Sequence, residues 1–115
     1  MSYVQGFMLA VPEANKDAYR EMAEKGWSMF KRYGALSMQE NWASDVQDGK
    51  VTSFPKAVKL EEGEAVVFSW IVWPDQETYQ AAWEKMMQDP EMDGMEMPFD
   101  GMRMMWGGFE VLFSS

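Results

Sequence analysis

Residues 64–73 read EAVVFSWIVW, and this apolar stretch decides the fold. The Glu62-Gly63 turn precedes it and Pro74 follows it, so the stretch predicts a β-strand. Successive side chains of a strand point to opposite faces of a sheet. One face therefore carries Val66, Phe68, Trp70 and Val72, and the other carries Val67, Ser69, Ile71 and Trp73.

The segments on either side predict the remaining elements. Further strands are predicted over residues 3–11, 36–43 and 102–113. Residues 14–33 repeat apolar side chains about every 3.6 residues, which predicts a helix with Asn15 as its N-cap and Gly34 at its end. Asp75 is predicted to cap a second helix, and Ser53 to cap a short helical turn.

The resulting order is β-α-β-β-α-β. It predicts an α+β, ferredoxin-like domain over residues 1–115, with a four-stranded antiparallel sheet covered by helices on one face. The uncovered face of such a sheet should be polar, but the strand at 64–73 is apolar on both faces. The last strand is similar, since Met102, Met104, Trp106 and Leu112 oppose Met105, Phe109, Val111 and Phe113.

An apolar face of this size is larger than a monomer usually exposes. The simplest cover is the same face of a second copy, so we expect a homodimer that packs sheet against sheet. The alternative is that these strands are merely central and that loops of the same chain cover them.

The composition limits the chemistry and the partners. The chain has 115 residues, a net charge of −9 at pH 7, and neither cysteine nor histidine. This excludes thiol nucleophiles, Ser-His-Asp triads and histidine-ligated haem, and no cofactor is expected. The acidic charge disfavours nucleic acid, and no apolar run is long enough to span a membrane. A cysteine-free chain whose first residues lack the basic start of a secretion signal is expected in the cytoplasm.

Five polar residues from different segments are candidates for one site at an end of the sheet. They are Asp45, Lys59, Ser69, Asp100 and Arg103. A carboxylate of Asp45 or Asp100 in an apolar setting would serve as a base, and Arg103 would hold an anionic substrate oxygen. The alternative is a structural ion pair between Arg103 and one of these carboxylates.

Four strings resemble the YbaA-like bacterial family, known as domain of unknown function 1428. They are MSYVQGFMLAVP at 1–12, KVTSFPKAVK at 50–59, EAVVFSWIVWP at 64–74 and MPFDGMRMMWGGFEV at 97–111. The resemblance implies the dimeric α/β-barrel superfamily, in which two ferredoxin-like subunits pack sheet to sheet. That superfamily includes cofactor-free monooxygenases and isomerases. Its monooxygenases use Asn, Trp and Tyr in a cleft between helices and sheet, which implies ligand-binding roles for Tyr19, Asn41, Trp70 and Trp106.

The chain also departs from the family pattern. Gln5 stands where the family commonly has an acidic residue, and Ala43-Ser44-Asp45 stands where it tends to have Gly-Asp-Asp. The loop over residues 91–97 is shorter than usual and richer in methionine.

Residues 88–101 and the segment after them carry two metal-like patterns. Asp89, Glu91, Asp93 and Gly94 follow the start of a calcium-binding EF-hand loop, but Pro90 and the strand that follows argue against one. The methionines at 92, 95, 97, 102, 104 and 105 would suit copper(I), but thioethers more often fill apolar gaps or line adaptable pockets. No metal site is therefore predicted. Gly107-Gly108, inside a strand, predicts a bulge or a close approach to the backbone by a ligand or a second copy.

We therefore expect a small apolar cleft between helices and sheet, closed by residues 88–101, with Lys59 and Ser69 also among its ligand-binding residues. Two functional classes stay open. One is a small-molecule binding protein, and the other is a cofactor-independent monooxygenase or isomerase acting on a small aromatic or keto-enol substrate. The absence of histidine removes the easiest base near neutral pH and so weighs mildly against an enzyme.

Overall fold

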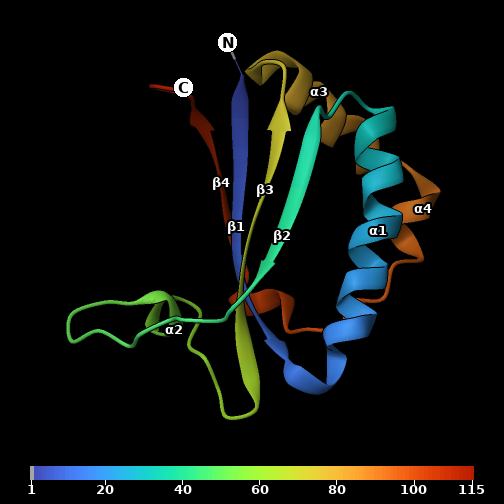
Figure 1. Cartoon of the computed structure of the whole chain (residues 1–115). Coiled ribbons are helices and arrows are strands. Elements are labelled where there is room, and N and C mark those ends of the chain that lie inside the picture. The colour runs from blue at the N-terminus through green and yellow to red at the C-terminus, as the bar shows by residue number, and fades with distance from the viewer. Residues whose placement is uncertain (1) are drawn as a thin grey trace.

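In residues 2–115, the part of the chain that the computed structural model describes, four strands form one antiparallel sheet in the order β2-β3-β1-β4 (Figure 1). The strands are β1 (Tyr3–Pro12), β2 (Ser37–Trp42), β3 (Glu64–Trp73) and β4 (Met105–Glu110). The central pair, β1 and β3, is in register from Tyr3 opposite Trp73 to Pro12 opposite Glu64. This order confirms the predicted ferredoxin-like α+β fold.

The longer helices lie together on one side of the sheet (Figure 1). They are α1 (Lys16–Arg32) and α3 (Gln76–Met86), and the short α4 (Pro90–Asp93) lies beside α1. The short α2 (Phe54–Ala57) belongs to a segment that extends from the other side. Single 3-10 turns, η1 (Glu13–Asn15) and η2 (Gly101–Arg103), precede α1 and β4.

The predicted capping signals are confirmed with one exception. Asp75 caps α3 by accepting the Thr78 N–H at 2.7 Å, and Ser53 caps α2. Gly34 follows the last turn of α1 with φ 112°, a conformation that favours glycine. Asn15 occupies the N-cap of α1 but makes no capping bond with its side chain.

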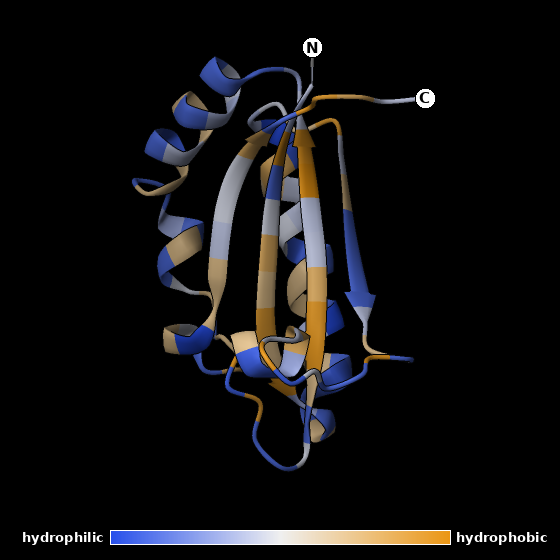
Figure 2. Cartoon of the chain, turned by 90° about the vertical axis from the view of Figure 1, so that its left-hand side faces the viewer, coloured by the Kyte–Doolittle hydropathy of each residue, from blue (hydrophilic) through white to orange (hydrophobic). Residues whose placement is uncertain are grey.

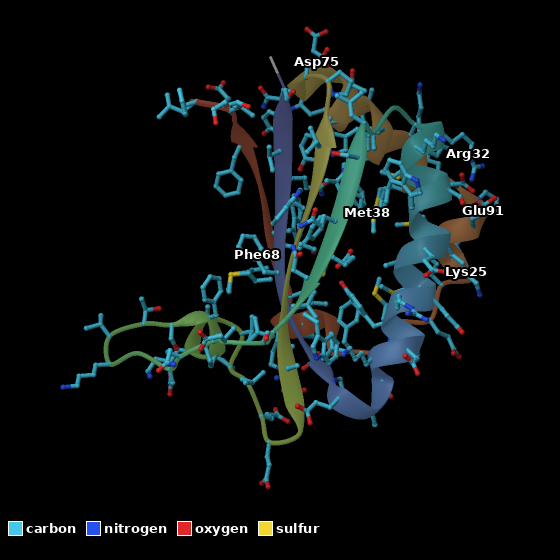
Figure 3. The ribbon with its side chains drawn as sticks, viewed as in Figure 1. Lys25, Arg32, Met38, Phe68, Asp75 and Glu91 are labelled. Carbon is cyan, nitrogen blue, oxygen red and sulfur yellow. The ribbon has the colours of Figure 1, made fainter. Side chains whose placement is uncertain are left out.

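The core lies between the helices and one face of the sheet, and β3 alternates as predicted. Its side chains at 65, 67, 69, 71 and 73 are all buried. Phe68 points away from α1, whereas Met38 of β2 points toward it (Figure 3). The largest buried side chain is that of Trp73, which no solvent reaches. The two-faced pattern of the third strand is therefore confirmed.

The start of the last strand was predicted wrongly. Residues 102 and 103 belong to η2, and β4 spans only Met105–Glu110. Asp100 causes the difference, because its carboxylate accepts the Met102 N–H and the Arg103 Nε–H, both at 3.0 Å, and so closes a turn. The predicted strand also extends too far at its end, since Leu112 and Phe113 follow β4 and are almost fully exposed.

The other face of the sheet, which is turned toward the viewer in Figure 2, carries a set of apolar side chains that we call the bare face. Its members are Val4, Met8, Phe68, Trp70, Val72, Met105 and Phe109. The segment around α2 covers only the end of this face, where Val58 packs on Ala10 and Val66. The alternative of a loop cover therefore holds for that end alone.

Gly107 and Gly108 lie in β4 opposite Gly6 and Gln5. A Cβ at Gly108 would collide with the ring of Tyr3. The predicted close approach to this backbone is therefore made by a side chain of the same chain. No helix within residues 2–115 is both long and apolar enough to cross a membrane.

Candidate functional site

A cavity of about 130 Å³ lies between the helices and the covered face of the sheet. The sheet contributes Phe7, Leu9, Ser69 and Ile71 to its lining. Met22, Gly26 and Met29 come from α1. The segment that contains α4 closes the cavity, and we call its lining residues Met92, Met95, Met97 and Phe99 the methionine lid. This is where the sequence predicted an apolar cleft.

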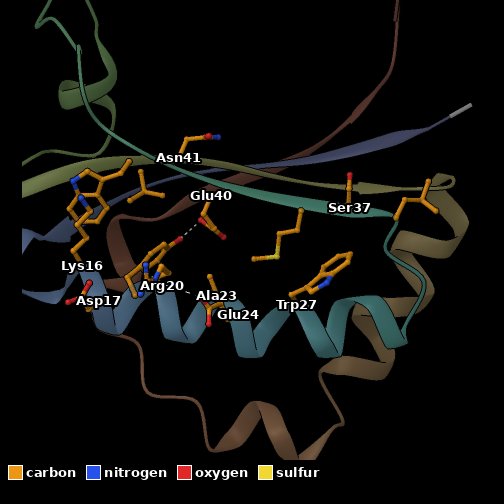
Figure 4. Close-up of a pocket in the computed structure, with 14 residues that line it drawn as sticks. Lys16, Asp17, Arg20, Ala23, Glu24, Trp27, Ser37, Glu40 and Asn41 are labelled. Carbon is orange, nitrogen blue, oxygen red and sulfur yellow. Dashed lines mark hydrogen bonds and ion pairs between the residues drawn. The ribbon is translucent and has the colours of Figure 1, made fainter.

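An open groove of about 620 Å³ runs between α1 and the edge strand β2 (Figure 4). Tyr19, Ala23, Met38 and Glu40 line both the groove and the inner cavity. These four residues therefore form the wall that the two spaces share. A molecule with a small apolar part and a polar end would fit an arrangement of this kind.

The two-residue period of strand β2 explains why a carboxylate lies in this shared wall. In β2, Met38, Glu40 and Trp42 face the helices, and Glu40 lies opposite the buried Ser69 of β3. Tyr19 lies on the buried stripe of α1 and donates its hydroxyl to Oε1 of Glu40 at 2.7 Å (Figure 4). Glu40, Tyr19 and Ser69 are thus the polar groups of an otherwise apolar chamber.

Burial raises the pKa of the Glu40 carboxyl, because a charge is disfavoured away from water. Hydrogen bonding from Tyr19 and Ser69 acts in the opposite direction and is the smaller effect. Glu40 is nevertheless an exposed residue on the groove side, so solvent screens its charge and keeps the rise smaller than a closed cavity would give. Burial, and then the charge of Glu40, raise the pKa of the Tyr19 hydroxyl, which therefore keeps its proton.

The charges at the mouth of the groove are engaged with one another. Arg20 faces Glu24 at 3.8 Å, and the Lys16 ammonium lies 5.2 Å from the centre of the Trp42 ring. Within residues 2–115, no Lys or Arg nitrogen lies within 4.0 Å of the Glu40 carboxylate. The carboxylate is thus held by a neutral phenol rather than by a cation.

Three polar contacts tie the methionine lid to α1 and its flanks. Asn15 donates its amide to the carbonyl of Pro98 at 2.9 Å, which explains why it forms no cap. Tyr33 donates its hydroxyl to Asp89 at 2.7 Å. Arg32 pairs with Glu91 at 2.9 Å. Two of these contacts are partly buried, and only the Arg32–Glu91 pair is exposed, where an ion pair is weak.

Arg103, a predicted site residue, forms a clasp at the other end of β3. Its two terminal nitrogens donate to the two carboxylate oxygens of Glu64, each at 2.7 Å. It also donates to Asp100 at 3.0 Å and to the carbonyl of Lys59 at 3.0 Å. The guanidinium lowers the pKa of both carboxyls. These are the contacts of a structural ion-pair cluster, the alternative considered for Arg103.

Of the other predicted residues, Asp100 joins this clasp through its carboxylate and Lys59 only through its backbone carbonyl. Ser69 and Tyr19 lie in the chamber, while Asp45 lies in an exposed loop beside Gln47. The exposed side chain of Lys59 is not part of the chamber lining.

Two of the predicted ligand-binding residues lie on the side of the sheet away from the chamber. Trp70 is on the bare face, and Asn41 donates its amide to the carbonyl of Phe68 at the rim of the groove. Trp106 lies opposite Phe7 on the edge strand β4 and is largely exposed. The five polar candidates and the three aromatic or amide candidates therefore do not form one site.

The acidic side chains of the calcium-like pattern have other partners. Asp89 accepts the Glu91 N–H and the Tyr33 hydroxyl, and Asp100 belongs to the Arg103 clasp. Across residues 2–115, no group of three acidic side chains is placed to hold a metal ion. The methionines at 92, 95, 97 and 104 line the apolar chamber instead.

Comparison with known sequences gives the family. Residues 2–101 match the family described as "Protein of unknown function (DUF1428)". The chain belongs to this family. It is 61% identical over 114 residues to "Uncharacterized protein YbaA" of Escherichia coli (strain K12) and equally to that of Shigella flexneri, with 97% of each chain covered. Among solved structures, it is similar to "De novo designed protein Foldit4" with a TM-score of 0.47 and 13% identity, over 96% of this chain and 99% of that one.

Sequence reasoning missed the main polar residue of this DUF1428 chain. Glu40 was assigned to a strand but was given no role. Met38, Glu40 and Trp42 are each two residues apart, so they share one face of the strand and place a charge on its apolar face. Gln5 was noted only as a departure from the family pattern. It is buried, and its side-chain oxygen accepts the indole N–H groups of Trp73 at 3.2 Å and Trp83 at 3.0 Å.

Proposed function

We propose that this DUF1428 protein binds a small, largely apolar molecule in the chamber between α1 and the sheet, as a homodimer in the cytoplasm. The observation that carries the proposal is the apolar chamber with a carboxylate, a phenol and a hydroxyl on its wall, next to an open groove. Within residues 2–115 the Glu40 carboxylate has no cationic partner. A binding site has a use for such a carboxylate, because it orients the ligand.

The size of the chamber indicates the size of the ligand. A cavity of about 150 Å³ lined by apolar side chains accepts benzene. The chamber, at about 130 Å³, is therefore suited to one ring, and the groove leaves room for a polar end. Methionine side chains adapt to the shape of what they contact, so the lid suits a ring without being specific to it.

A larger side chain in the wall shared by the two spaces tests this function. Ala23 lines both the groove and the chamber, and Ala23→Leu would reduce the space between them. We use 2-phenylethanol as a one-ring probe and follow binding by saturation-transfer NMR. The wild-type protein is expected to bind the probe, and Ala23→Leu to lose it. Ala18→Leu, at an exposed position of the same helix, is the control and should bind normally. Failure of the wild-type protein to bind the probe, or equal binding by Ala23→Leu, would contradict the proposal.

One observation favours an enzyme as the second candidate. A carboxylate whose pKa is raised by burial, beside a phenol that keeps its proton, is suited to removing a proton from a carbon acid. Glu40 would take the proton next to a carbonyl, and Tyr19 would stabilise the enolate by hydrogen bonding. This would be cofactor-independent chemistry on a small aromatic ketone, as in an isomerase or the first step of a monooxygenase.

Proton exchange tests the enzyme. In D₂O, 1-phenylpropan-2-one would exchange its α-protons faster with the wild-type protein than with Glu40→Gln, as measured by proton NMR. Glu21→Gln, which removes an exposed carboxylate of α1 away from the groove, should exchange as fast as the wild type. Equal rates with and without Glu40 would rule out this base and leave the binding function standing.

The homodimer is proposed from the bare face. Phe68 and Phe109 are 43% and 61% exposed there, on a face with few charges to keep it in water. Burying one such side chain stabilises an assembly by about 1.5–3 kcal/mol. A second copy brings a face of the same shape and character, so sheet-to-sheet packing covers both at once.

The oligomeric state tests the homodimer. Sedimentation at micromolar concentration should give a dimer for the wild-type chain and a monomer for Phe109→Glu. Met87→Glu adds the same charge at an exposed apolar position beyond the end of α3 and should remain a dimer. A monomeric wild-type chain, or a dimer that survives Phe109→Glu, would contradict sheet-to-sheet packing.

A further inference from the structure

The charge balance of the groove favours cations over anions. Its lining carries two basic side chains, Lys16 and Arg20, and three acidic ones, Asp17, Glu24 and Glu40. The acidic side chains therefore exceed the basic ones by one, and the two basic groups, both exposed, face Glu24 and the Trp42 ring. The chain as a whole has a net charge of −9, which attracts cations to every opening on its surface.

Three aromatic side chains, those of Tyr19, Trp27 and Trp42, line the same groove as the Glu40 carboxylate. The face of an aromatic ring attracts ammonium groups, and several rings with a carboxylate are the usual means of binding an organic cation. The chain gives its own example, because the Lys16 ammonium lies over the Trp42 ring at one end of the groove.

We propose that the ligand is a protonated amine on a small apolar body. Its ammonium group lies in the groove against the Glu40 carboxylate, and its apolar part enters the chamber under the methionine lid. This inference rests on the proposed binding function and names the ligand class for the same site.

The contacts around Glu40 support this choice over a neutral ligand. Tyr19 provides one hydrogen bond to the carboxylate, and no cation in the described chain neutralises it. Hydrogen bonds that involve a charged group contribute about 1.5–3 kcal/mol, more than bonds between neutral groups. A ligand ammonium would provide both the missing positive charge and additional hydrogen-bond donors to Glu40. The aromatic side chains that line the groove would lie beside it.

Three one-ring probes that differ in their polar end test the proposal. They are 2-phenylethylamine, 2-phenylethanol and 3-phenylpropanoate, each titrated into the wild-type protein by isothermal titration calorimetry at pH 7. The amine is expected to bind at least about tenfold more tightly than the alcohol, and the carboxylate not to bind measurably. Equal or tighter binding of the alcohol or of the carboxylate would overturn the amine preference and leave the chamber as a binding site. If no probe binds, the proposed function fails together with the inference.

Removing the carboxylate shows whether Glu40 causes the preference. In Glu40→Gln, the amine is expected to fall to the affinity of the alcohol, whereas the affinity of the alcohol stays within about twofold of wild type. Glu21→Gln makes the same change of net charge outside the groove and should keep the preference. An unchanged preference in Glu40→Gln would overturn the assignment to this residue.

A pH series on the wild-type protein tests the same point without a substitution. The amine stays protonated over the acid range, so its affinity should fall as Glu40 takes up its proton, while that of the alcohol stays constant. The other charged groups that face this space are Lys16, Asp17, Arg20 and Glu24 of α1, since apart from Glu40 the sheet and the lid contribute only neutral side chains. Loss of amine affinity in Glu40→Gln, over the same acid range, would assign the effect to α1 and overturn the role of Glu40.

Discussion

Single buried polar side chains fix the geometry of this protein at points where apolar packing cannot. Gln5 is an example, since one amide oxygen in β1 accepts indole N–H groups from Trp73 of β3 and Trp83 of α3. Because hydrogen bonds are directional, Gln5 fixes the orientation of α3 relative to the sheet as well as their contact. Glu40 and Tyr19 make a similar link between β2 and α1, but beside an open groove.

Replacing Gln5 should destabilise the fold according to whether the acceptor is kept. Gln5→Leu leaves two buried indole donors unsatisfied, at about 1–3 kcal/mol for each. Gln5→Glu keeps an oxygen for both donors, so it should lose clearly less. Urea denaturation of the two variants measures the difference. Equal stability of Gln5→Leu and Gln5→Glu would contradict the role of this acceptor.

Glu40→Gln should stabilise the fold at neutral pH. Because burial raises the pKa of Glu40 in the folded state, its ionised form works against folding above that pKa. The variant should gain about 0.5 kcal/mol at pH 7, a small value because water in the groove screens the charge. The gain should shrink as the pH falls through the raised pKa toward the ordinary value of 4.5. Thermal unfolding of both proteins across this range measures it, and a variant less stable than the wild type at pH 7 would refute the argument.

At the scale of elements, the methionine lid is the least firmly held part of the chamber. It lies on the segment made of α4 and the irregular residues up to η2, and only three side-chain contacts, one of them exposed, tie this segment to α1 and its flanks. Elements with few buried contacts open most easily without unfolding the rest. The lid is therefore the part of the chamber that can move aside for a ligand.

Cutting one tie should loosen the lid alone. Tyr33→Phe removes the hydroxyl that donates a hydrogen bond to Asp89 but leaves the ring in place. Amide hydrogen exchange over residues 88–99 should become faster, while the urea midpoint of the whole protein stays the same. A matched change at Tyr79, whose ring packs on Tyr3 and Trp73 of the sheet, should alter neither region. Unchanged exchange in Tyr33→Phe would show that other contacts hold the lid.

The sequence was sufficient for the elements and their order, because strand and helix periods, Asp75, Ser53 and Gly34 are local signals. It was insufficient for the site, because Arg103 and Glu64 are 39 residues apart and their bidentate pairing depends on the folded register. The same holds for Glu40. Its neighbour Ser69 is set by the β2–β3 register, and its phenol donor comes from another element.

At the scale of the whole molecule, charge and apolar surface oppose each other. Each copy carries a net charge of −9, and two copies brought together repel. The bare face supplies the attraction that must exceed this repulsion. The balance depends on salt, since ions screen charge much more than they affect apolar burial.

Salt should therefore strengthen the proposed homodimer. Raising sodium chloride from about 0.05 to about 0.5 M shortens the range of the repulsion well below the size of the molecule. The dimer dissociation constant, measured by analytical ultracentrifugation, should fall over this range. Phe109→Glu should stay monomeric at both concentrations. A dissociation constant that rises with salt would indicate that ion pairs, rather than the bare face, hold the copies together.

The alternation of side chains in β2 gives the turn before it an odd-even constraint. Glu40 faces the ligand chamber, and its neighbours Gln39 and Asn41 face the outside. Inserting or deleting one residue in the turn from Gly34 to Leu36 would exchange the two faces of β2. The Glu40 side chain would then point away from the helices, and the Gln39 and Asn41 side chains would point toward them. A two-residue change would preserve the orientation of every side chain. Length variation in this turn should therefore come in even steps, and a single-residue change would damage both surfaces of the sheet at once.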